Sequence, residues 1–298
     1  MKFRQLKYFV SLAQTGIFSE AADQVHVSQP ALSQQIQKLE DNLETTLFER
    51  MSSGVKLTPA GEEFFPYAID TLDSLRDARE SIKHPDGEKL NGTLRMGIIP
   101  TIAPYLLPDM INFFHRRHPE LTLYIEEQQT ETLLDRLKMG EVDHLILSPP
   151  IPKQGFETET IGTEPFYLAV GNQEDMAGRT SVSIEEIDRE PMLLLEEGHC
   201  LRDQSVSFCE RENVQPDVVF QGSNLQSILN LVETGFGMTF VPRMVLHGYD
   251  SEQLRFVPFT DPVPERDLIL VRRSSFNDRL IQKRLIEFTS DWFANQEA

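Results

Sequence analysis

Residues 18–43 of the chain, FSEAADQVHVSQPALSQQIQKLEDNL, decide the fold of its first part. Ala21 and Ala22 give the first half of this stretch a small-residue face, against which another helix can pack closely. The turn residues 26–28 follow, and Pro30 lies in the first turn of the next helix, where its missing N–H costs nothing. The stretch therefore predicts two short helices joined by a tight turn, an arrangement that can place the second helix in the major groove of DNA.

The second of these helices has two distinct faces. Ser28 is its expected cap, and Leu32, Ile36, Leu39 and Leu43 form an inward stripe. The opposite face carries hydroxyl and amide side chains, which can hydrogen-bond to the edges of bases. A three-helix bundle whose polar face is merely solvated is the alternative interpretation.

Residues 48–57 predict a hairpin, or wing, after this helix. Gly54 provides its turn, and Arg50 and Lys56 are cations that could touch the phosphates of DNA. The residues of the helix and the wing that we predict to contact DNA are Ser28, Gln29, Pro30, Ser33, Gln34, Gln37, Arg50 and Lys56.

A long helix is predicted to follow the wing. Thr58-Pro59 is a strong helix start, and apolar residues then recur at steps of three, four, three and seven, at Phe65, Ala68, Leu72, Leu75 and Ile82. This spacing is typical of a dimerisation helix or of a core helix, and the acidic neighbours of the stripe favour dimerisation. His84-Pro85-Asp86-Gly87 ends the pattern and predicts a domain boundary.

The rest of the chain alternates between strand and helix patterns. Strands are expected near residues 94–98, 121–125, 142–147, 166–170, 192–195, 218–220, 238–241 and 268–271, and helices near 104–117, 130–139, 201–212, 225–234 and 278–293. This order predicts an α/β fold with two Rossmann-like lobes of the periplasmic-binding-protein kind, joined by a long linker helix to an all-α winged helix-turn-helix head. The expected domains are residues 1–58 for the DNA-binding head, 59–91 for the linker (dimerisation) helix and hinge, and 92–298 for a regulatory domain, in which residues 92–163 and 267–298 form lobe I and residues 164–266 form lobe II.

The charge of the chain is unevenly distributed. Its formal net charge is −19, yet residues 1–58 hold six Lys or Arg and six Asp or Glu. Taken as a whole, the net charge argues against a protein that coats nucleic acid through a basic surface, but its uneven distribution suggests a small DNA- or partner-binding head on an acidic body. Such a head would need dimerisation to gain affinity for DNA.

Composition excludes several other classes of protein. We find neither a basic start followed by an apolar run nor a stretch of about 18 apolar residues, so a cytoplasmic protein without a membrane partner is expected. Two cysteines in that compartment cannot be a structural disulfide framework. Because Gly-rich phosphate loops, nucleophile elbows and Cys-x-x-Cys pairs are all missing from the sequence, we expect no cofactor and no metal.

Both cysteines lie in residues 198–209, GHCLRDQSVSFC. Cys200 follows a predicted strand at a helix start, with His199 and Arg202 beside it, and each of these features favours the thiolate. Such a thiolate attacks a peroxide to give a sulfenic acid, which a second cysteine, here Cys209, can resolve into a disulfide. Two ordinary buried cysteines are the alternative.

The spacing of the two cysteines limits how they could pair. In one continuous helix, nine residues of rise would separate them by about 13.5 Å along the axis. The Cα atoms of a disulfide must come within roughly 7 Å of each other. Oxidation would therefore require the helix to unravel, which would make a local redox event a conformational switch.

The head and the cysteine segment resemble those of a known family. Residues 4–66 are similar to the winged helix-turn-helix of LysR-type transcriptional regulators, through Phe18-Ser19-Glu20-Ala21-Ala22, Val27-Ser28-Gln29-Pro30-Ala31-Leu32-Ser33, Ile36-Gln37-Lys38-Leu39-Glu40, Leu47-Phe48-Glu49-Arg50 and Leu57-Thr58-Pro59-Ala60-Gly61. Within that family the chain resembles the hydrogen-peroxide sensors, through Gly97-Ile98-Ile99-Pro100-Thr101, Pro104-Tyr105-Leu106-Leu107-Pro108, and Gly198-His199-Cys200-Leu201-Arg202-Asp203-Gln204 with Cys209.

The resemblance implies a cytoplasmic transcription activator of the oxidative-stress response, not an enzyme. It implies that the protein binds double-stranded promoter DNA and senses hydrogen peroxide by reversible disulfide formation between Cys200, the peroxidatic cysteine, and Cys209, the resolving one. The peroxide pocket that it implies consists of Thr101, Thr130, His199, Arg202, Asp203 and Arg273. It also implies a homo-oligomer, with dimers through the linker helix and a tetramer overall, and RNA polymerase and a thiol reductant such as glutaredoxin or thioredoxin as further partners.

Other interpretations remain open at this point. From the residues alone, Thr130 could be a helix cap and Thr101 a plain loop residue. A LysR-type regulator could instead bind a small metabolite between the lobes, with Thr101, Ser223 and Asn224 as contacts. A thiol peroxidase would consume peroxide in turnover, but the predicted DNA-binding head argues against it.

Overall fold

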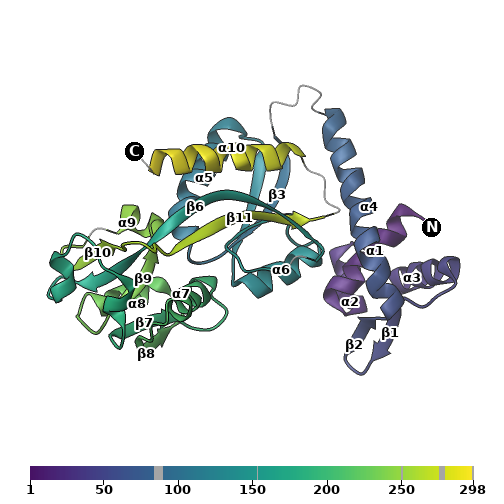
Figure 1. Cartoon of the computed structure of the whole chain (residues 1–298). Helices are drawn as coiled ribbons and strands as arrows, with labels where there is room; N and C mark the ends of the chain where they lie inside the picture. Colours follow the sequence, from purple (N-terminus) through teal and green to yellow (C-terminus); the bar gives the residue numbers. More distant parts are fainter. Residues whose placement is uncertain (84–89, 153, 250, 275–278, 297–298) are drawn as a thin grey trace. The chain divides into compact units, whose positions relative to one another are not determined.

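The computed structural model describes residues 1–83, 90–152, 154–249, 251–274 and 279–296 (Figure 1). The chain forms two compact units. The first runs from Met1 through the long helix α4, and the second begins at Leu90 and contains nearly all of the rest.

Three helices build the core of the head, and two of them are the pair that the sequence predicts over residues 18–43. Their shared interior contains Phe9, Leu12, Leu32 and Leu39, all fully buried. His26 has a positive φ of 58° in the turn between the second and third helices. The helices are α1 (Phe3–Thr15), α2 (Phe18–Gln24) and α3 (Gln29–Leu43).

The predicted wing is an antiparallel hairpin of β1 (Phe48–Met51) and β2 (Gly54–Leu57). Val55 N donates a 2.8 Å hydrogen bond to Gly16 O, which fastens the wing to the turn after α1. A Cβ atom on Gly54 would lie only 2.4 Å from the same oxygen, and Gly54 has a φ of 142°. This close approach therefore requires glycine at position 54.

The long helix α4 (Pro59–Lys83) begins as part of the head. Phe65 and Ala68 are buried in the core of the head, whereas Leu72 and Leu75 are only half-buried. The first half of α4 is thus a core helix, and dimerisation through its second half stays a prediction. The side chain of Ile82 and the predicted break at residues 84–87 lie outside the described residues.

The second unit has two hydrophobic cores that share two long strands. A seven-stranded sheet has the order β10-β6-β11-β5-β3-β4, with β9 also paired to β6. Strands β6 and β11 run through both halves of the unit, and the parallel pair β7–β8 joins the second half through a bridge between Met192 and Met238. The strands are β3 (Gly92–Ile98), β4 (Leu121–Glu127), β5 (His144–Leu147), β6 (Phe156–Gly171), β7 (Pro191–Leu195), β8 (Asp217–Gly222), β9 (Thr239–Pro242), β10 (Leu254–Pro258) and β11 (Glu265–Arg273).

Helices cover both faces of the first half of this sheet (Figure 1). Helices α5 (Ala103–Arg117) and α10 (Arg279–Gln296) pack together, with the rings of Phe113 and Phe288 5.2 Å apart. Helix α6 (Thr130–Lys138) lies on the opposite side, where Leu133 meets Gly97 of β3. The second half holds α7 (Cys200–Arg211), α8 (Leu225–Val232), α9 (Met244–Gly248) and the 3₁₀ turns at Asp175–Gly178 and Ile184–Ile187.

Three elements differ from the sequence prediction. Only residues 166–170 were expected as a strand, but β6 starts ten residues earlier, at Phe156. Residues 157–160 are all exposed, so they carry no alternation of apolar and polar residues that would reveal a strand. Strand β10 and the short helix α9 were not predicted.

Candidate functional site

Cys200 lies where the two cores of the second unit meet. It is the first residue of α7, after a loop in which Gly198 has a φ of 93°, and His199 is the cap. Most of the surrounding chain, including Leu201 and Phe208, packs into the second core, but Cys200 belongs to the first. The helix start therefore places this thiol against the opposite half of the unit.

A narrow crevice lies over Cys200. Its walls are Ile99, Pro100, Thr101, Gln129, Thr130, Gly198 and His199. In this conformation the crevice is too small to admit a water molecule, and only 6% of Cys200 is exposed. A peroxide molecule can reach the sulfur only when the crevice opens.

Burial also changes the acidity of Cys200, and this corrects the sequence-based expectation of an accessible thiolate. Burial raises the pKa of the Cys200 thiol, and the positive charge of Arg266 opposes that rise. His199 does not supply the expected charge, because burial lowers the pKa of its imidazole and keeps the ring neutral. The thiol is therefore neutral in the closed crevice.

Arg266 of β11 is the cation that faces this site, and the sequence analysis missed it. Its guanidinium is completely buried and pairs with the buried carboxylate of Glu164 at 2.9 Å. It also donates to Thr101 Oγ1 at 3.1 Å and to Thr101 O at 3.2 Å. The signal was present, since the inward positions of β11 alternate through Arg266 and Leu268.

The two threonines of the crevice hold different positions. Thr101 lies in a loop, as the alternative interpretation expected, but its hydroxyl is fixed by Arg266. Thr130 begins α6, yet its Oγ1 is buried and has no hydrogen-bond partner among the described residues. Since this hydroxyl caps nothing, the interpretation of Thr130 as a helix cap is wrong, and Oγ1 is left able to bond to a small guest.

His199 is fixed on both of its ring nitrogens. Its Nε2 lies 3.2 Å from the amide nitrogen of Gln129, which donates to it, so the ring proton sits on Nδ1, where the Ser223 backbone is the partner. The ring is 5% exposed and forms part of the crevice wall. His199 can therefore orient a guest without carrying charge.

Arg202 and Asp203 lie at the edge of this arrangement. Arg202 is close to two carboxylates, Glu197 at 3.8 Å and Asp203 at 3.7 Å. The side chain of Asp203 is about half exposed, and its charge raises the pKa of Cys200. Neither residue lines the crevice itself.

The structure does not bring Arg273 to the crevice, which corrects its predicted place. Arg273 donates to the carbonyls of Leu137 at 2.8 Å and Val142 at 2.9 Å, and its guanidinium lies 3.9 Å from Asp143. It is seven residues from Arg266 along β11, which is about 23 Å of strand. Arg266 takes the place that the sequence assigned to Arg273.

Cys209 lies at the other end of the same continuous helix. It is 4% exposed in the second core, and burial raises the pKa of its thiol to about 11. Both thiols are free. Because α7 is unbroken between them, the roughly 13.5 Å of axial separation applies, and a disulfide needs the helix to rearrange.

The residues predicted to contact DNA are spread over α3 and the wing. Ser28 precedes α3 and makes no side-chain cap, and Gln37 is occupied by a 3.0 Å hydrogen bond to Asp41. Exposed side chains are those of Ser28, Gln29, Pro30, Gln34, Gln37, Arg50 and Lys56, while Ser33 is half-buried. Arg50 pairs with Val55 and Lys56 with Glu49, so the two wing cations lie on opposite faces of the hairpin.

Two features are absent from the residues that the structure describes. No helix there is long and apolar enough to span a membrane. No group of three or more His, Cys, Asp or Glu side chains in those ranges is arranged to hold a metal ion.

Comparison with known proteins gives consistent matches over almost the whole chain. Residues 3–62 match the bacterial regulatory helix-turn-helix proteins of the lysR family, and residues 87–294 match the LysR substrate binding domain. The hydrogen peroxide-inducible genes activator of Dickeya chrysanthemi is 38% identical over 277 residues, which cover 92% of this chain and 90% of that protein.

Solved structures agree with these matches. A full-length OxyR variant from Pseudomonas aeruginosa has a TM-score of 0.80 at 35% identity, over 98% of this chain and 94% of that one. Oxidised OxyR from Corynebacterium glutamicum has a TM-score of 0.61 at 32% identity, over 99% and 93%. The chain therefore belongs to the LysR family of transcriptional regulators, and within that family it is similar to the OxyR proteins.

Proposed function

We propose that this chain is a transcription activator that senses hydrogen peroxide through Cys200 and Cys209. The observation that supports this most is the place of the two thiols: one helix carries Cys200 in the first core and Cys209 in the second. A bond between them must pull α7 out of its present packing. Oxidation would thereby change how the two halves of the regulatory unit fit together.

The chemistry proceeds in two balanced steps. The Cys200 thiolate attacks one oxygen of hydrogen peroxide, the O–O bond breaks, and the leaving hydroxide takes a proton and departs as water. Cys209 then attacks the sulfenic sulfur of Cys200, the S–S bond forms, and a second water leaves. The hydroxyls of Thr101 and Thr130 lie beside the sulfur and can hold the peroxide and its leaving oxygen.

The remaining pocket residues have supporting roles in this proposal. His199 orients the peroxide as a neutral hydrogen-bonding group, and Arg202 and Asp203 tie the first turn of α7 to its loop. Arg266 offsets the negative charge at the sulfur and is the buried cation of the site, where the resemblance implied Arg273.

The proposed domains follow the sequence prediction. Residues 1–58 bind double-stranded promoter DNA, residues 59–91 link and dimerise, and residues 92–298 regulate, with lobe I at 92–163 and 267–298 and lobe II at 164–266. Exposure of Gln29, Gln34 and Lys56 supports the DNA contacts. We further propose a homotetramer in the cytoplasm that contacts RNA polymerase, is not an enzyme, and is reset by a thiol reductant such as glutaredoxin or thioredoxin.

Mass spectrometry under non-reducing conditions tests this proposal. After near-stoichiometric peroxide, we expect an intramolecular Cys200–Cys209 link that a dithiol reverses and that shifts the DNA footprint. The Cys209→Ser variant should stop at the sulfenic acid, and Cys200→Ser should show neither product. A Cys200→Ser variant that still responds fully to peroxide would sink the sensing proposal.

A second candidate function rests on a separate cavity. About 250 Å³ of space lies between the two halves of the unit, with Thr101, Tyr105, Asn224 and Tyr249 in its walls. Asn224 already caps α8 through Ser227 N, so only its amide nitrogen is left for a ligand. A thermal-shift screen with small organic acids would detect a metabolite sensor; stabilisation without any disulfide after peroxide would favour it.

A further inference from the structure

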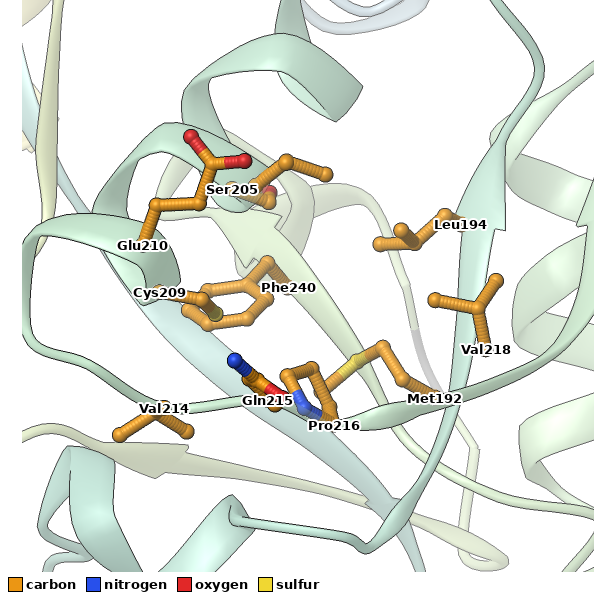
Figure 2. A pocket seen from close by; sticks show the side chains of 11 residues that line it. Met192, Leu194, Ser205, Cys209, Glu210, Val214, Gln215, Pro216, Val218 and Phe240 are labelled. Carbon is orange, nitrogen blue, oxygen red and sulfur yellow. The ribbon is translucent and has the colours of Figure 1, made fainter.

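A second cavity, of about 200 Å³, lies beside Cys209 (Figure 2). Helix α7 forms one wall with Val206 and Cys209. The strands opposite supply Met192, Leu194, Val218 and Phe240. Figure 2 shows Cys209 of α7 and Phe240 of β9 among the side chains that line the cavity. The cavity thus joins the helix that carries both cysteines to the sheet of the second half.

The chemistry of the walls selects the kind of guest. Ser205 also lines the cavity, but its hydroxyl already donates a 2.8 Å hydrogen bond to Leu201 O. The other polar side chains are Glu210 and Gln215, both exposed, so they belong to the mouth. Inside the cavity a charged guest would lose its hydration, because the polar side chains with free groups stand at the mouth, and the carboxylate of Glu210 there would repel an anion. The site therefore suits an uncharged apolar molecule.

The size of the cavity limits that guest further. A dry apolar cavity of about 150 Å³ is large enough to bind benzene. Some 200 Å³ therefore accommodates a single aromatic ring with a short substituent. We propose that this cavity is a binding site for small neutral monocyclic aromatic compounds, and that its occupant holds the chain in the reduced conformation.

The link to oxidation rests on the function proposed above. Cys209 and its neighbours on α7 form one wall, and disulfide formation must move that wall. A guest that touches both α7 and the strands binds the present conformation and loses its site when α7 rearranges. Because the guest binds only the present conformation, it lowers the rate of disulfide formation and leaves the rate at which Cys200 reacts with peroxide unchanged.

Binding is tested first, with toluene on the reduced full-length chain. Val218 lines the cavity and Val219, its neighbour on β8, does not, although they are similarly exposed at 43% and 41%. Val218→Phe should fill the site, and Val219→Phe is the matched control. We expect toluene to raise the Tm of the wild type and of Val219→Phe, and to give saturation-transfer NMR signals with both. Neither effect should appear with Val218→Phe.

Benzoate serves as the charged counterpart of toluene and should leave the Tm unchanged. If Val218→Phe fails to fold, Val206→Phe fills the cavity from α7 and replaces it. Equal toluene binding by wild type and by the filled variants, or none by wild type, would overturn the site. Equal binding of benzoate would overturn its assignment to neutral guests.

Coupling is tested by oxidation with and without toluene. At ten times its Kd, toluene should slow disulfide formation about elevenfold, while trapping of the Cys200 sulfenic acid proceeds at the same rate. An unchanged disulfide rate in toluene-saturated protein would overturn the coupling. If no disulfide forms even without toluene, the proposed sensing function fails, and the binding result stands by itself.

Discussion

At the scale of single residues, burial sets the protonation state of Cys200 by favouring its neutral thiol. Its pKa lies above the ordinary thiol value, and the Arg266 charge offsets the burial only in part. Since the thiolate is the nucleophile, its fraction rises with pH throughout the range below that pKa. We expect the rate of sulfenic acid formation to increase steadily from pH 6 to pH 9.

The Cys209→Ser variant isolates this step, because its sulfenic acid cannot be resolved and can be trapped with a dione. Burial lowers the pKa of the His199 imidazole below its ordinary value, so most of this pH range lies above the titration of that ring. A rate that is flat between pH 6 and pH 9 would mean that the open crevice lowers the pKa of Cys200 well below that of the closed form.

Removal of the Thr130 hydroxyl should change the stability of the fold and the reactivity of Cys200 in opposite directions. The buried Oγ1 of Thr130 has no partner in the described part of the chain, and an unpartnered buried hydroxyl costs about 1–3 kcal/mol. Thr130→Val replaces it with a methyl group of similar shape. We expect the free energy of unfolding of the variant, measured by urea denaturation, to exceed that of the wild type by about 1 kcal/mol or more. We also expect the variant to react more slowly with peroxide.

The matched change at the second threonine should act in the opposite direction on stability. Thr101 Oγ1 accepts a hydrogen bond from Nη1 of the buried Arg266, so Thr101→Val removes one of the partners of that guanidinium, although Glu164 and Thr101 O still engage it, and destabilises the fold. Loss of stability in Thr130→Val would show that its hydroxyl is already satisfied, for instance by an ordered water, and is not held ready for peroxide.

At the scale of elements, helix α7 is tethered at its middle. Gln204 donates to Ser148 Oγ at 2.7 Å and to Pro149 O at 2.6 Å, both just after β5 in the first half of the unit. These bonds must break when α7 rearranges. With each worth about 1 kcal/mol, Gln204→Leu should speed the disulfide step about fivefold or more.

Gln282→Leu is the control for this prediction. Gln282 of α10 donates to Glu159 at 2.8 Å, well away from α7, so its loss should leave the disulfide rate unchanged. Rates are compared by quenching with an alkylating agent and counting free thiols. If Gln204→Leu does not exceed the control, α7 leaves its packing before the tether breaks or only after the slow step.

The elements also show how far the sequence could predict the structure. Local apolar spacing, together with Gly and Pro residues that end elements, predicts the helices and the wing of the head. The same signals predict the single helix that carries both cysteines. They do not predict the crevice, because Arg266 and Gln129 reach it from parts of the chain distant from Cys200. Sequence neighbours suggested His199 and Arg202 as the charges near the thiol, yet burial neutralises the first and carboxylates engage the second.

At the scale of the whole molecule, oxidation and DNA binding are carried by separate compact units. The first half of α4 is committed to the core of the head through Phe65 and Ala68. A movement of the first half of α4 therefore carries the core of the head with it. For the oligomer proposed above, this favours a change of spacing between its heads over a change within α3.

The charge of the molecule makes the wing important for affinity. The chain carries a net charge of −19, and its first 58 residues carry none, so few cations are available for phosphates. Lys56 is exposed on the face of the wing that points away from the partly buried Phe48, Val55 and Leu57. Each phosphate contact contributes about −0.9 to the slope of log K against log salt concentration.

We therefore expect Lys56→Ala to weaken binding to all DNA sequences alike and to reduce that slope by about 0.9 for each head on the DNA. Fluorescence anisotropy over a series of salt concentrations measures both effects. Lys283→Ala removes an equally exposed lysine from α10 and controls for the change in net charge. If both variants shift the slope equally, the acidic body acts through its overall field; if only Lys56→Ala does, the wing touches the phosphate backbone. The second outcome is expected, because ions screen a distant charge within about 10 Å at 0.1 M salt, whereas a direct contact persists.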